Sequence, residues 1–347
     1  MRAPATPHHE ECVGGTLPSA DDPLTRADPG APTMTPQATD VRSAAPAELL
    51  ADLRAARSGA DDQLQAVLDT WGLRPLSGGR NNHVYAWAGP DGDICIKIYR
   101  KNDGRRRSER EWHALSAIAR HGTRHYAPTP LWLDDQDDQP ALGMSLVPGT
   151  PITDLADISG TLKALAEATR AMQTIPLAEP LASLDRIDSA AHYMIRLTDV
   201  WPQQLADHPD DPQTPTMRAL LSQWERSGDA DILARPAPAV FSRGDSNLLN
   251  WHHAADQIFC VDFEFAGRSD VAVDAADHTE HISARDFPDD VWRTLEADLG
   301  VDHNNRARFE AAQRTIALRW LAALWKQRDR RVEEFTTQLQ RVQNLFN

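Results

Sequence analysis

Three polar residues in the second half of the chain have the types and the spacing that phosphoryl transfer needs. Asp245 precedes Asn250 by five residues, and the apolar, strand-forming segment Ile258–Val261 then ends at Asp262. One carboxylate can face an acceptor hydroxyl, while an Asn and an Asp supply the hard oxygen ligands that Mg²⁺ prefers. The pattern therefore predicts a site that transfers a phosphoryl group from a nucleotide.

A lysine that could neutralise nucleotide phosphates lies in the apolar segment Ile94–Tyr99. Strand alternation puts Lys97 on the same face as Cys95, so its side chain could also point to solvent. A phosphate-binding lysine needs a carboxylate to orient it, and the following segment offers Glu109 and Glu111. Glu111 opens the apolar helical periodicity and is the better candidate, whereas Glu109 fits a solvated first-turn acid that the helix dipole favours.

The elements that would position these residues change from strands to helices along the chain. Before residue 148, we expect short strands that include a hairpin at Gly89–Gly92, and a helix over Glu109–Arg120. After residue 148, apolar residues with a 3.6-residue period predict five helices: Ile158–Ile175, Ala190–Ala206, Thr216–Arg226, Asp289–Leu299 and Arg306–Asn344. The sequence thus predicts an α+β fold, with a small β-rich lobe followed by a larger helical lobe.

Composition and pattern divide the chain into three parts. Residues 1–44 are rich in Pro, Ala, Asp and Thr and contain no aromatic residue. Such a segment cannot bury enough apolar surface to offset the entropy lost on ordering. We expect a disordered tail over residues 1–44, a nucleotide-binding lobe over residues 45–147, and a catalytic and acceptor-binding lobe over residues 148–347.

The charge and the apolar content exclude some partners. A net charge of −15 disfavours nucleic acid and anionic membranes. Between Asp262 and Asp302 there are twelve acidic and three basic residues, which fits a cationic small-molecule acceptor but also plain surface acidity. The chain has no run of about 18 apolar residues and no apolar secretory signal, so we expect a cytoplasmic protein with reduced cysteines. The oligomeric state stays unknown.

Together, these motifs resemble the aminoglycoside phosphotransferase/choline kinase family, a branch of the protein-kinase-like fold. The resemblance extends from Leu73 to His281 and includes the segments ICIKIY, MSLVPGT and VDFE. It implies a bilobal fold with a small antiparallel-sheet N-lobe and a larger helical C-lobe. It also implies an ATP- and Mg²⁺-dependent O-phosphotransferase that acts on a hydroxyl of a small molecule, such as an aminoglycoside or another amine-bearing antibiotic or metabolite. GTP remains open as the co-substrate.

The resemblance assigns roles to individual residues. Asp245 would be the catalytic base or would orient the acceptor hydroxyl, and Asn250 and Asp262 would be the Mg²⁺ ligands. Three further residues could contact the acceptor or a second metal: Glu264, His278 and His281. The nucleotide would contact Ser77, Gly78, Gly79, Lys97, Glu111, Ser145 and Val147.

One position departs from the family's pattern, because Arg243 stands where the family usually has a His before Gly-Asp. An arginine there could pair with a nearby carboxylate, and Asp274 would cap or brace the catalytic loop. Arg243 is the only support for the alternative of a catalytically silent nucleotide-binding protein that acts through partners, since the other reactive positions are filled. A protein kinase is disfavoured, because Gly267 follows Asp262 almost at once and leaves no segment for an activation loop.

Overall fold

The computed structural model describes residues 47–57, 61–76, 82–89, 92–101, 103–135, 138–155 and 158–347. The expected tail over residues 1–44 lies outside these ranges, and so do the predicted nucleotide-loop residues Ser77, Gly78 and Gly79. Within the described ranges, no helix combines the length and the apolar character that crossing a membrane requires.

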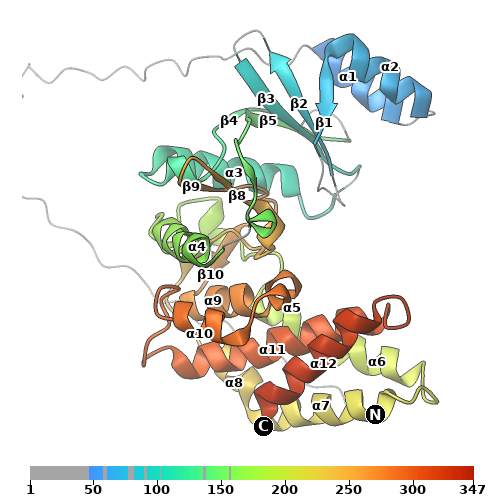
Figure 1. Cartoon of the computed structure of the whole chain (residues 1–347), viewed down its shortest axis with the longest axis vertical. Coiled ribbons are helices and arrows are strands. Elements are labelled where there is room, and N and C mark those ends of the chain that lie inside the picture. The colour runs from blue at the N-terminus through green and yellow to red at the C-terminus, as the bar shows by residue number, and fades with distance from the viewer. Residues whose placement is uncertain are drawn as a thin grey trace, which may run out of the picture. The chain divides into compact units, whose positions relative to one another are not determined.

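A five-stranded antiparallel sheet forms the first part of the fold (Figure 1). Its strands, in the spatial order β1-β2-β3-β5-β4, are β1 (Leu73–Pro75), β2 (His83–Gly89), β3 (Gly92–Ile98), β4 (Pro130–Asp134) and β5 (Ala141–Ser145). Three helices pack around it: α1 (Ala47–Arg57), α2 (Asp61–Trp71) and α3 (Arg107–Arg120). Because side chains alternate along β3, Ile96 enters the core shared with α1 and α2, while Lys97 faces α3.

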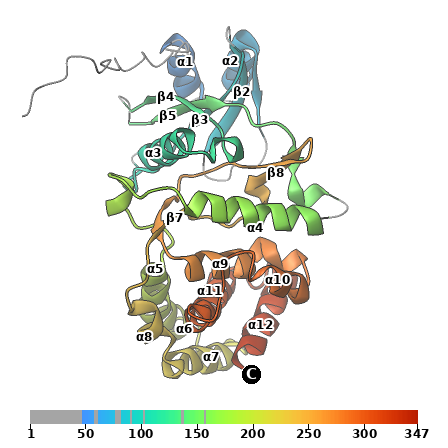
Figure 2. The same ribbon diagram turned by 90° about the vertical axis from the view of Figure 1, so that its left-hand side faces the viewer.

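Helices dominate the second part of the fold. Helix α4 (Ser159–Gln173) crosses between the sheet and the lower helices (Figure 2). The further α-helices are α5 (Ala190–Ile195), α6 (Trp201–Ala206), α7 (Thr214–Ser227), α8 (Asp229–Ala234), α9 (Val271–Glu280), α10 (Asp289–Leu295), α11 (Arg306–Trp325) and α12 (Val332–Phe346). The small antiparallel sheet is followed along the chain by a larger helical part, which is the α+β architecture that the sequence predicted.

Short strands among these helices carry the predicted catalytic motif. Strand β8 (Trp251–Ala254) pairs with β6 (Thr150–Pro151) on one side and with β9 (Gln257–Cys260) on the other. Strand β7 (Val240–Ser242) pairs with β10 (Gly267–Ser269). The pairing of β7 with β10 brings the two ends of the motif together, although these strands are separated along the chain.

Two predicted helices are interrupted. The segment Arg306–Asn344 forms α11 and α12 rather than one helix, because the intervening residues Lys326–Arg331 are all polar and offer no apolar side chain for packing. Helix α12 instead folds back, and the ring of Phe335 lies 6.3 Å from that of Trp325. The segment Ala190–Ala206 is α5 and α6 joined by a π-helical turn over Arg196–Val200.

One core cluster continues from the sheet into the helical part. It includes Leu115 of α3 and Met144 of β5 together with Trp251, the first residue of β8, and Phe263, which follows β9. The expected boundary between residues 147 and 148 falls in the segment that joins β5 to β6. The elements that carry Lys97 and Asp262 are therefore packed on a common apolar core.

Strands β4 and β5 approach each other at a position that only glycine permits. After a β-bulge between Pro130 and Trp132, Trp132 pairs with Gly143, and a Cβ added at Gly143 would lie 2.1 Å from the indole. Gly143→Ala should therefore lower the free energy of unfolding by about 1–3 kcal/mol through overpacking, as measured by urea denaturation. The control is Gly104→Ala, where an added Cβ meets nothing within 4 Å.

The same loss in a Trp132→Leu background would contradict this explanation, because the indole is then absent. We expect the effect of Gly143→Ala to shrink in that background.

Candidate active site

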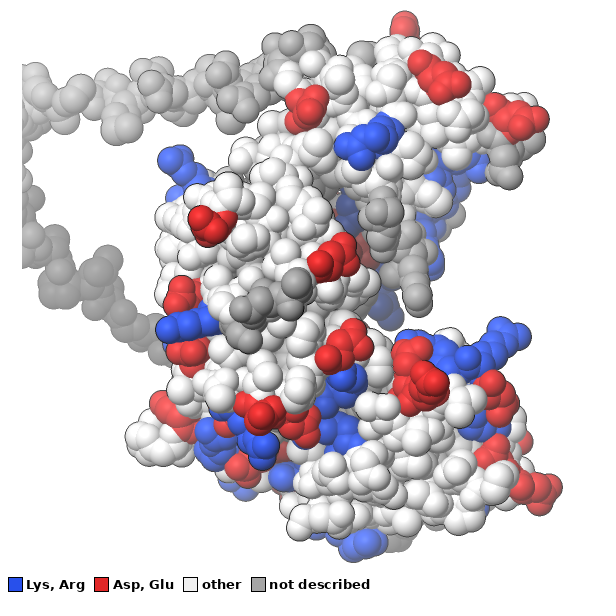
Figure 3. Space-filling model, in the orientation of Figure 1, with Lys and Arg blue, Asp and Glu red and all other residues white. Residues whose placement is uncertain are grey.

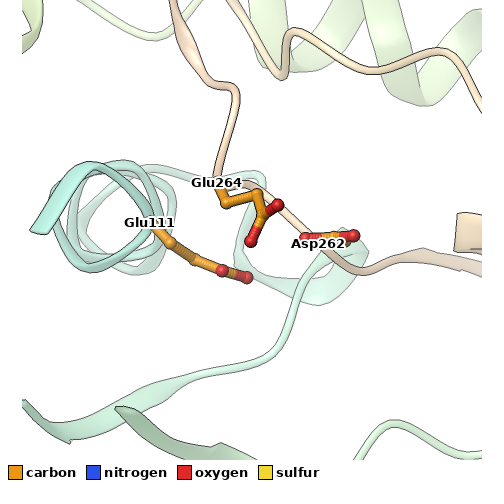
Figure 4. Close-up of side chains that lie close together, drawn as sticks. All are labelled: Glu111, Asp262 and Glu264. Carbon is orange, nitrogen blue, oxygen red and sulfur yellow. The ribbon is translucent and has the colours of Figure 1, made fainter. Parts of the chain in front are cut away.

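Lys97 is a buried lysine enclosed by three carboxylates. Figure 4 shows Glu111 on α3 converging with Asp262 and Glu264, which follow β9. Lys97 Nζ lies 2.6 Å from Glu111 Oε2, 2.6 Å from Asp262 Oδ1 and 3.2 Å from Glu264 Oε2. Burial alone would lower the pKa of Lys97, but Asp262 and Glu111 raise this pKa well above its ordinary value. The lysine is therefore protonated and points inward.

Glu111 ties α3 to this cluster. It is completely buried, and its Oε2 also accepts a hydrogen bond of 2.6 Å from the hydroxyl of Tyr99. Its Oε1 accepts a 3.1 Å hydrogen bond from the backbone N–H of Phe263. Glu109 instead pairs with Arg106 on the helix surface. Of the two glutamates that the sequence offered, Glu111 is the one beside Lys97.

Glu264 is the third carboxylate of the cluster. Its Oε2 accepts a hydrogen bond from the side-chain amide of Asn82, and its Oε1 lies 3.6 Å from Arg107 Nη1. Burial raises the pKa of Glu264, although Lys97 opposes this effect. Arg107 was not among the predicted site residues. Its position four residues before Glu111, on the same face of α3, is the signal that could have found it.

The hairpin formed by β8 and β9 brings Asn250 and Asp262 to its open end. The strands pair up to Cys260, and the backbone N–H of Val261 then donates a 2.9 Å hydrogen bond to the carbonyl oxygen of Asn250. The chain turns at Asp262, whose φ of 68° lies in the left-handed region. Burial disfavours the charged form of Asp262, but the Lys97 ammonium holds its pKa below the ordinary value. The carboxylate is therefore ionised at neutral pH.

Asp245 lies on a tight turn that precedes this hairpin. Gly244 has a φ of 82°, and an added Cβ would lie 2.1 Å from the carbonyl oxygen of Phe265, so the turn requires glycine. Asp245 Oδ1 accepts a 3.0 Å hydrogen bond from the backbone N–H of Asn247. Its Oδ2 accepts a 2.9 Å hydrogen bond from the side-chain amide of Asn250. Asp245 and Asn250, which are five residues apart, are thus in direct contact.

Arg243 is bonded to the backbone of the turn that carries Asp262. Its Nη2 donates a 3.0 Å hydrogen bond to the carbonyl oxygen of Val261 and lies 3.4 Å from that of Asp262. The guanidinium lies over the rings of Trp251 and Phe263, at 5.7 and 5.9 Å from their centroids. The sequence suggested a carboxylate partner, but among the described residues the hydrogen-bond partners of Arg243 are carbonyl groups.

A second buried arginine supports the turn at Gly244 that precedes Asp245. Arg186 donates a 2.9 Å hydrogen bond to the carbonyl oxygen of Gly244 and pairs with Asp274 and Asp277 of α9. Burial would lower the pKa of Arg186, but Asp277 beside it raises this pKa above its ordinary value. Asp274 therefore braces the turn through Arg186, whereas the cap of α9 is Asp270, which accepts from two backbone N–H groups. Neither Arg186 nor Asp277 carries a local sequence signal for this role.

The two predicted histidines lie in different surroundings. His278 is buried, its Nε2 lies 3.3 Å from the hydroxyl of Thr169, and burial lowers its pKa to about 3. His281 follows the end of α9, and its Nε2 lies 3.7 Å from Asp245 Oδ1. The structure thus brings His281, but not His278, next to Asp245.

Two of the predicted nucleotide contacts, Ser145 and Val147, which the family resemblance assigns to the adenine edge, lie at the exit of β5. The backbone N–H of Ser145 donates a 2.9 Å hydrogen bond to the carbonyl oxygen of Thr129, so a contact of Ser145 with adenine would use the Ser145 carbonyl. Val147 follows in the segment between β5 and β6.

The acidic residues between Asp262 and Asp302 are largely neutralised. Eight of the twelve form ion pairs with Lys or Arg: Asp262, Glu264, Asp270, Asp274, Asp277, Glu280, Asp289 and Glu296. Figure 3 shows acidic and basic side chains interspersed over the lower, helical part of the visible face. The local excess of acidic residues therefore does not by itself indicate a cationic acceptor.

Comparisons with known proteins agree with this architecture. A choline/ethanolamine kinase family protein from Mesorhizobium loti is 17% identical, with a TM-score of 0.58 over 86% of this chain and 95% of that one. A thermostable mutant of aminoglycoside phosphotransferase APH(4)-Ia, solved with ADP and hygromycin B, is 14% identical, with a TM-score of 0.54 over 81% and 97% of the two chains. Spectinomycin phosphotransferase APH(9)-Ia, solved with ADP and spectinomycin, is 9% identical, with a TM-score of 0.55 over 82% and 94%.

The fold and the family now define the class of protein. The fold is that of the protein-kinase-like phosphotransferases, as the sequence predicted. Residues 72–291 match the model of the phosphotransferase enzyme family, and the chain belongs to this family. It is therefore a small-molecule kinase. No curated protein matches the sequence.

The buried pair of Arg186 with the acids of α9 generates a stability prediction. Arg186→Met would leave Asp274 and Asp277 buried without their cation, which should lower the free energy of unfolding by about 3–5 kcal/mol. The matched control is Arg268→Met, because Arg268 pairs with Asp185 at the surface and should contribute less than about 1 kcal/mol. Denaturant unfolding of both variants gives the comparison. Equal losses would show that burial of the pair does not matter.

Proposed function

We propose that this kinase transfers the γ-phosphoryl group of Mg·ATP to a hydroxyl of a small molecule. The observation that carries the proposal is the juxtaposition of two groups at the open end of the hairpin. One is Lys97 with its carboxylates, and the other is Asp245 in hydrogen-bond contact with Asn250. A phosphate-binding cation, a metal-binding pair and a base are the parts that this chemistry requires.

Lys97 would bind the nucleotide phosphates. Glu111 holds the lysine at 2.6 Å and is itself fixed by Tyr99 and the backbone of Phe263, so the ammonium is oriented before a nucleotide arrives. The charged form of Lys97 persists despite burial, because Asp262 and Glu111 favour it. Preorganised charge of this kind stabilises a transition state without reorganisation at the moment of reaction.

The residues at the hairpin end fit a divalent cation. Asn250 donates to Asp245 through Nδ2, so its amide oxygen Oδ1 is not used in this contact. Carboxylate oxygens of Glu111, Asp262 and Glu264 lie within 4.8 Å of one another, and hard oxygens suit Mg²⁺. We assign Asn250 and Asp262 as the ligands, with Glu264 available to a second ion. Bound Mg²⁺ would neutralise charge on the phosphate oxygens.

Asp245 would receive the proton of the acceptor. As the acceptor oxygen forms its bond to the γ-phosphorus, its O–H bond breaks and the proton passes to the Asp245 carboxylate, while the bond from the γ-phosphorus to the bridging oxygen breaks and ADP leaves. Hydrogen bonds from Asn247 and Asn250 fix the carboxylate for this step. Such a loose transfer depends mainly on positioning and charge.

We take amine-bearing alcohols, including aminoglycosides, as the first acceptors to test. Support comes from the family match and from similar folds that were solved with hygromycin B or spectinomycin. ATP is the first nucleotide to test, and GTP is the second. The free thiols of Cys95 and Cys260 are consistent with a reducing compartment, so we place the reaction in the cytoplasm.

Nucleotide binding should depend on Mg²⁺, because the ligand pair would hold the nucleotide through the metal. ATP at 100 times its Kd should stabilise the protein by about 2.7 kcal/mol when Mg²⁺ is present, and far less without it. Thermal unfolding with ATP, with and without Mg²⁺, measures the difference. Calorimetry that detects no binding of Mg·ATP would refute the proposed enzyme and leave a binding or structural role.

Two single substitutions should separate chemistry from binding. Asp245→Asn removes the charge that accepts the proton, so turnover should fall by about 10²-fold or more while the affinity for Mg·ATP stays close to that of the wild type. Asp262→Asn removes a metal ligand and should weaken Mg·ATP binding as well. The measurements are steady-state rates with an acceptor found in a panel of amino-alcohols and antibiotics, and calorimetry with Mg·ATP.

The matched control for both variants is Asp256→Asn, at the tip of the same hairpin. It makes the same chemical change outside the site and should leave the turnover and the affinity for Mg·ATP unchanged. Near-normal turnover of Asp245→Asn would show that Asp245 is not the base and would move attention to Glu264.

A further inference from the structure

His281 is the polar side chain that faces the predicted base from the helical part of the fold. It follows α9, is 7% exposed, and places Nε2 at 3.7 Å from Asp245 Oδ1. The proposed reaction already uses Asp245, but it gives no role to this ring. Its surroundings define which ring nitrogen carries the proton, and hence what the ring can do to Asp245.

The tautomer of His281 follows from its contact with Ser283. The backbone N–H of Ser283 donates a 3.2 Å hydrogen bond to His281 Nδ1. A backbone N–H can only donate, so Nδ1 must be an acceptor and the neutral ring carries its proton on Nε2. Nε2 is the nitrogen that faces Asp245, and the ring therefore presents an N–H donor to the carboxylate.

A chain of hydrogen bonds extends this arrangement back to the catalytic loop. The Ser283 hydroxyl lies 2.8 Å from His281 Nδ1 and accepts a 3.0 Å hydrogen bond from the backbone N–H of Leu248. The hydroxyl hydrogen is thus available to Nδ1. The ring is also packed against Trp320 of α11, with the two ring centroids 4.7 Å apart and the planes at 80°. His281 is fixed from three directions.

Burial keeps the ring neutral despite the two carboxylates near it. Burial is the largest influence that lowers the pKa of His281, and the nearby Arg243 and Arg319 lower it further, while Asp245 and Asp277 oppose them. A neutral ring with its proton on Nε2 is a donor that does not remove the negative charge that Asp245 needs.

We propose that His281 is a positioning residue for the phosphoryl transfer, whose Nε2–H fixes the Asp245 carboxylate from the side opposite Asn250. This inference rests on the proposed function of Asp245. At 3.7 Å the contact is longer than a hydrogen bond, and such contacts in a free enzyme tighten in the complex with substrates. Asn247, Asn250 and His281 would then surround the carboxylate with three neutral donors, which leaves one lone pair for the proton of the acceptor.

Histidine NMR tests the contact without relying on activity. In the full chain labelled with ¹⁵N-histidine, the His281 signals are assigned by their loss in His281→Phe. They should report a proton on Nε2, and the Nε2 signal should shift in Asp245→Asn but not in the control Asp256→Asn. A proton on Nδ1, or an Nε2 signal that does not respond to Asp245→Asn, overturns the proposal.

Kinetics test the consequence, with Mg·ATP as the only substrate and water as the phosphoryl acceptor. His281→Phe keeps an aromatic ring against Trp320 but removes the Nε2–H donor, so the rate of ATP hydrolysis should fall by about tenfold or more while the KM for Mg·ATP stays unchanged. The Ser283 N–H also loses its Nδ1 acceptor, so we expect a lower melting temperature in both His281→Phe and His281→Gln. His281→Gln restores an N–H at a similar reach and should recover most of the rate. The control His303→Phe alters an exposed histidine and should have no effect.

Failure of this inference is distinguishable from failure of the proposed function. If His281→Gln is as slow as His281→Phe, the positioning role is wrong. If the wild type does not bind Mg·ATP, the proposed function is wrong, and so is the positioning role. The NMR comparison still decides whether His281 contacts Asp245.

Discussion

The buried charge of Lys97 is the constraint on which the arrangement of the site depends. One ammonium group lies among three carboxylates, which come from α3 and from the segment after β9. Removing one partner of such a buried pair typically costs about 3–5 kcal/mol, because the other charge stays desolvated. The strand that carries Lys97, the helix that carries Glu111 and the turn that carries Asp262 must therefore stay together. The three carboxylates carry more negative charge than Lys97 and the nearby Arg107 carry positive charge. This excess favours the binding of a further cation.

The helical part also buries charged groups, but here the buried acids of one helix are neutralised by arginines. Helix α9 is buried, yet it carries Asp274, Asp277 and Glu280, whose charges need partners in the interior. Arginines from distant parts of the chain supply them: Arg186 precedes α5, and Arg341 lies in α12. Through Arg186, the pairing also reaches the carbonyl of Gly244, so the same ion pairs that make the burial of α9 possible hold the turn next to Asp245.

Arginine at position 243 is compatible with an intact site. Its guanidinium bonds to the carbonyl of Val261 and stacks on two aromatic rings, so it supports the turn at Asp262 without competing for the carboxylates of Lys97. The departure from the family's usual histidine therefore gives no structural support to a catalytically silent protein.

The sequence by itself determined the fold class and the main candidates for chemistry. The alternation in Ile94–Ile98, the helical period after Glu109, and the order of Asp245, Asn250 and Asp262 are local patterns, and local patterns survive without a tertiary structure. They predicted the sheet, most helices and the family. The break in the last helix was missed, because apolar residues with helical spacing resume after the polar segment Lys326–Arg331, and only the packing of α12 against α11 shows that the chain folds back there.

Only the tertiary structure decided which charges meet. The sequence could not tell whether Lys97 points inward. It also left open whether the acids between Asp262 and Asp302 form a free acidic surface, whereas most of them are paired with Lys97 or with arginines. Asp277, Arg186 and the contact of His281 with Asp245 also have no local signature. The physical reason is that an ion pair or a hydrogen bond depends on distances between elements that are far apart in the chain, whereas the periodicity of apolar residues depends only on the element itself.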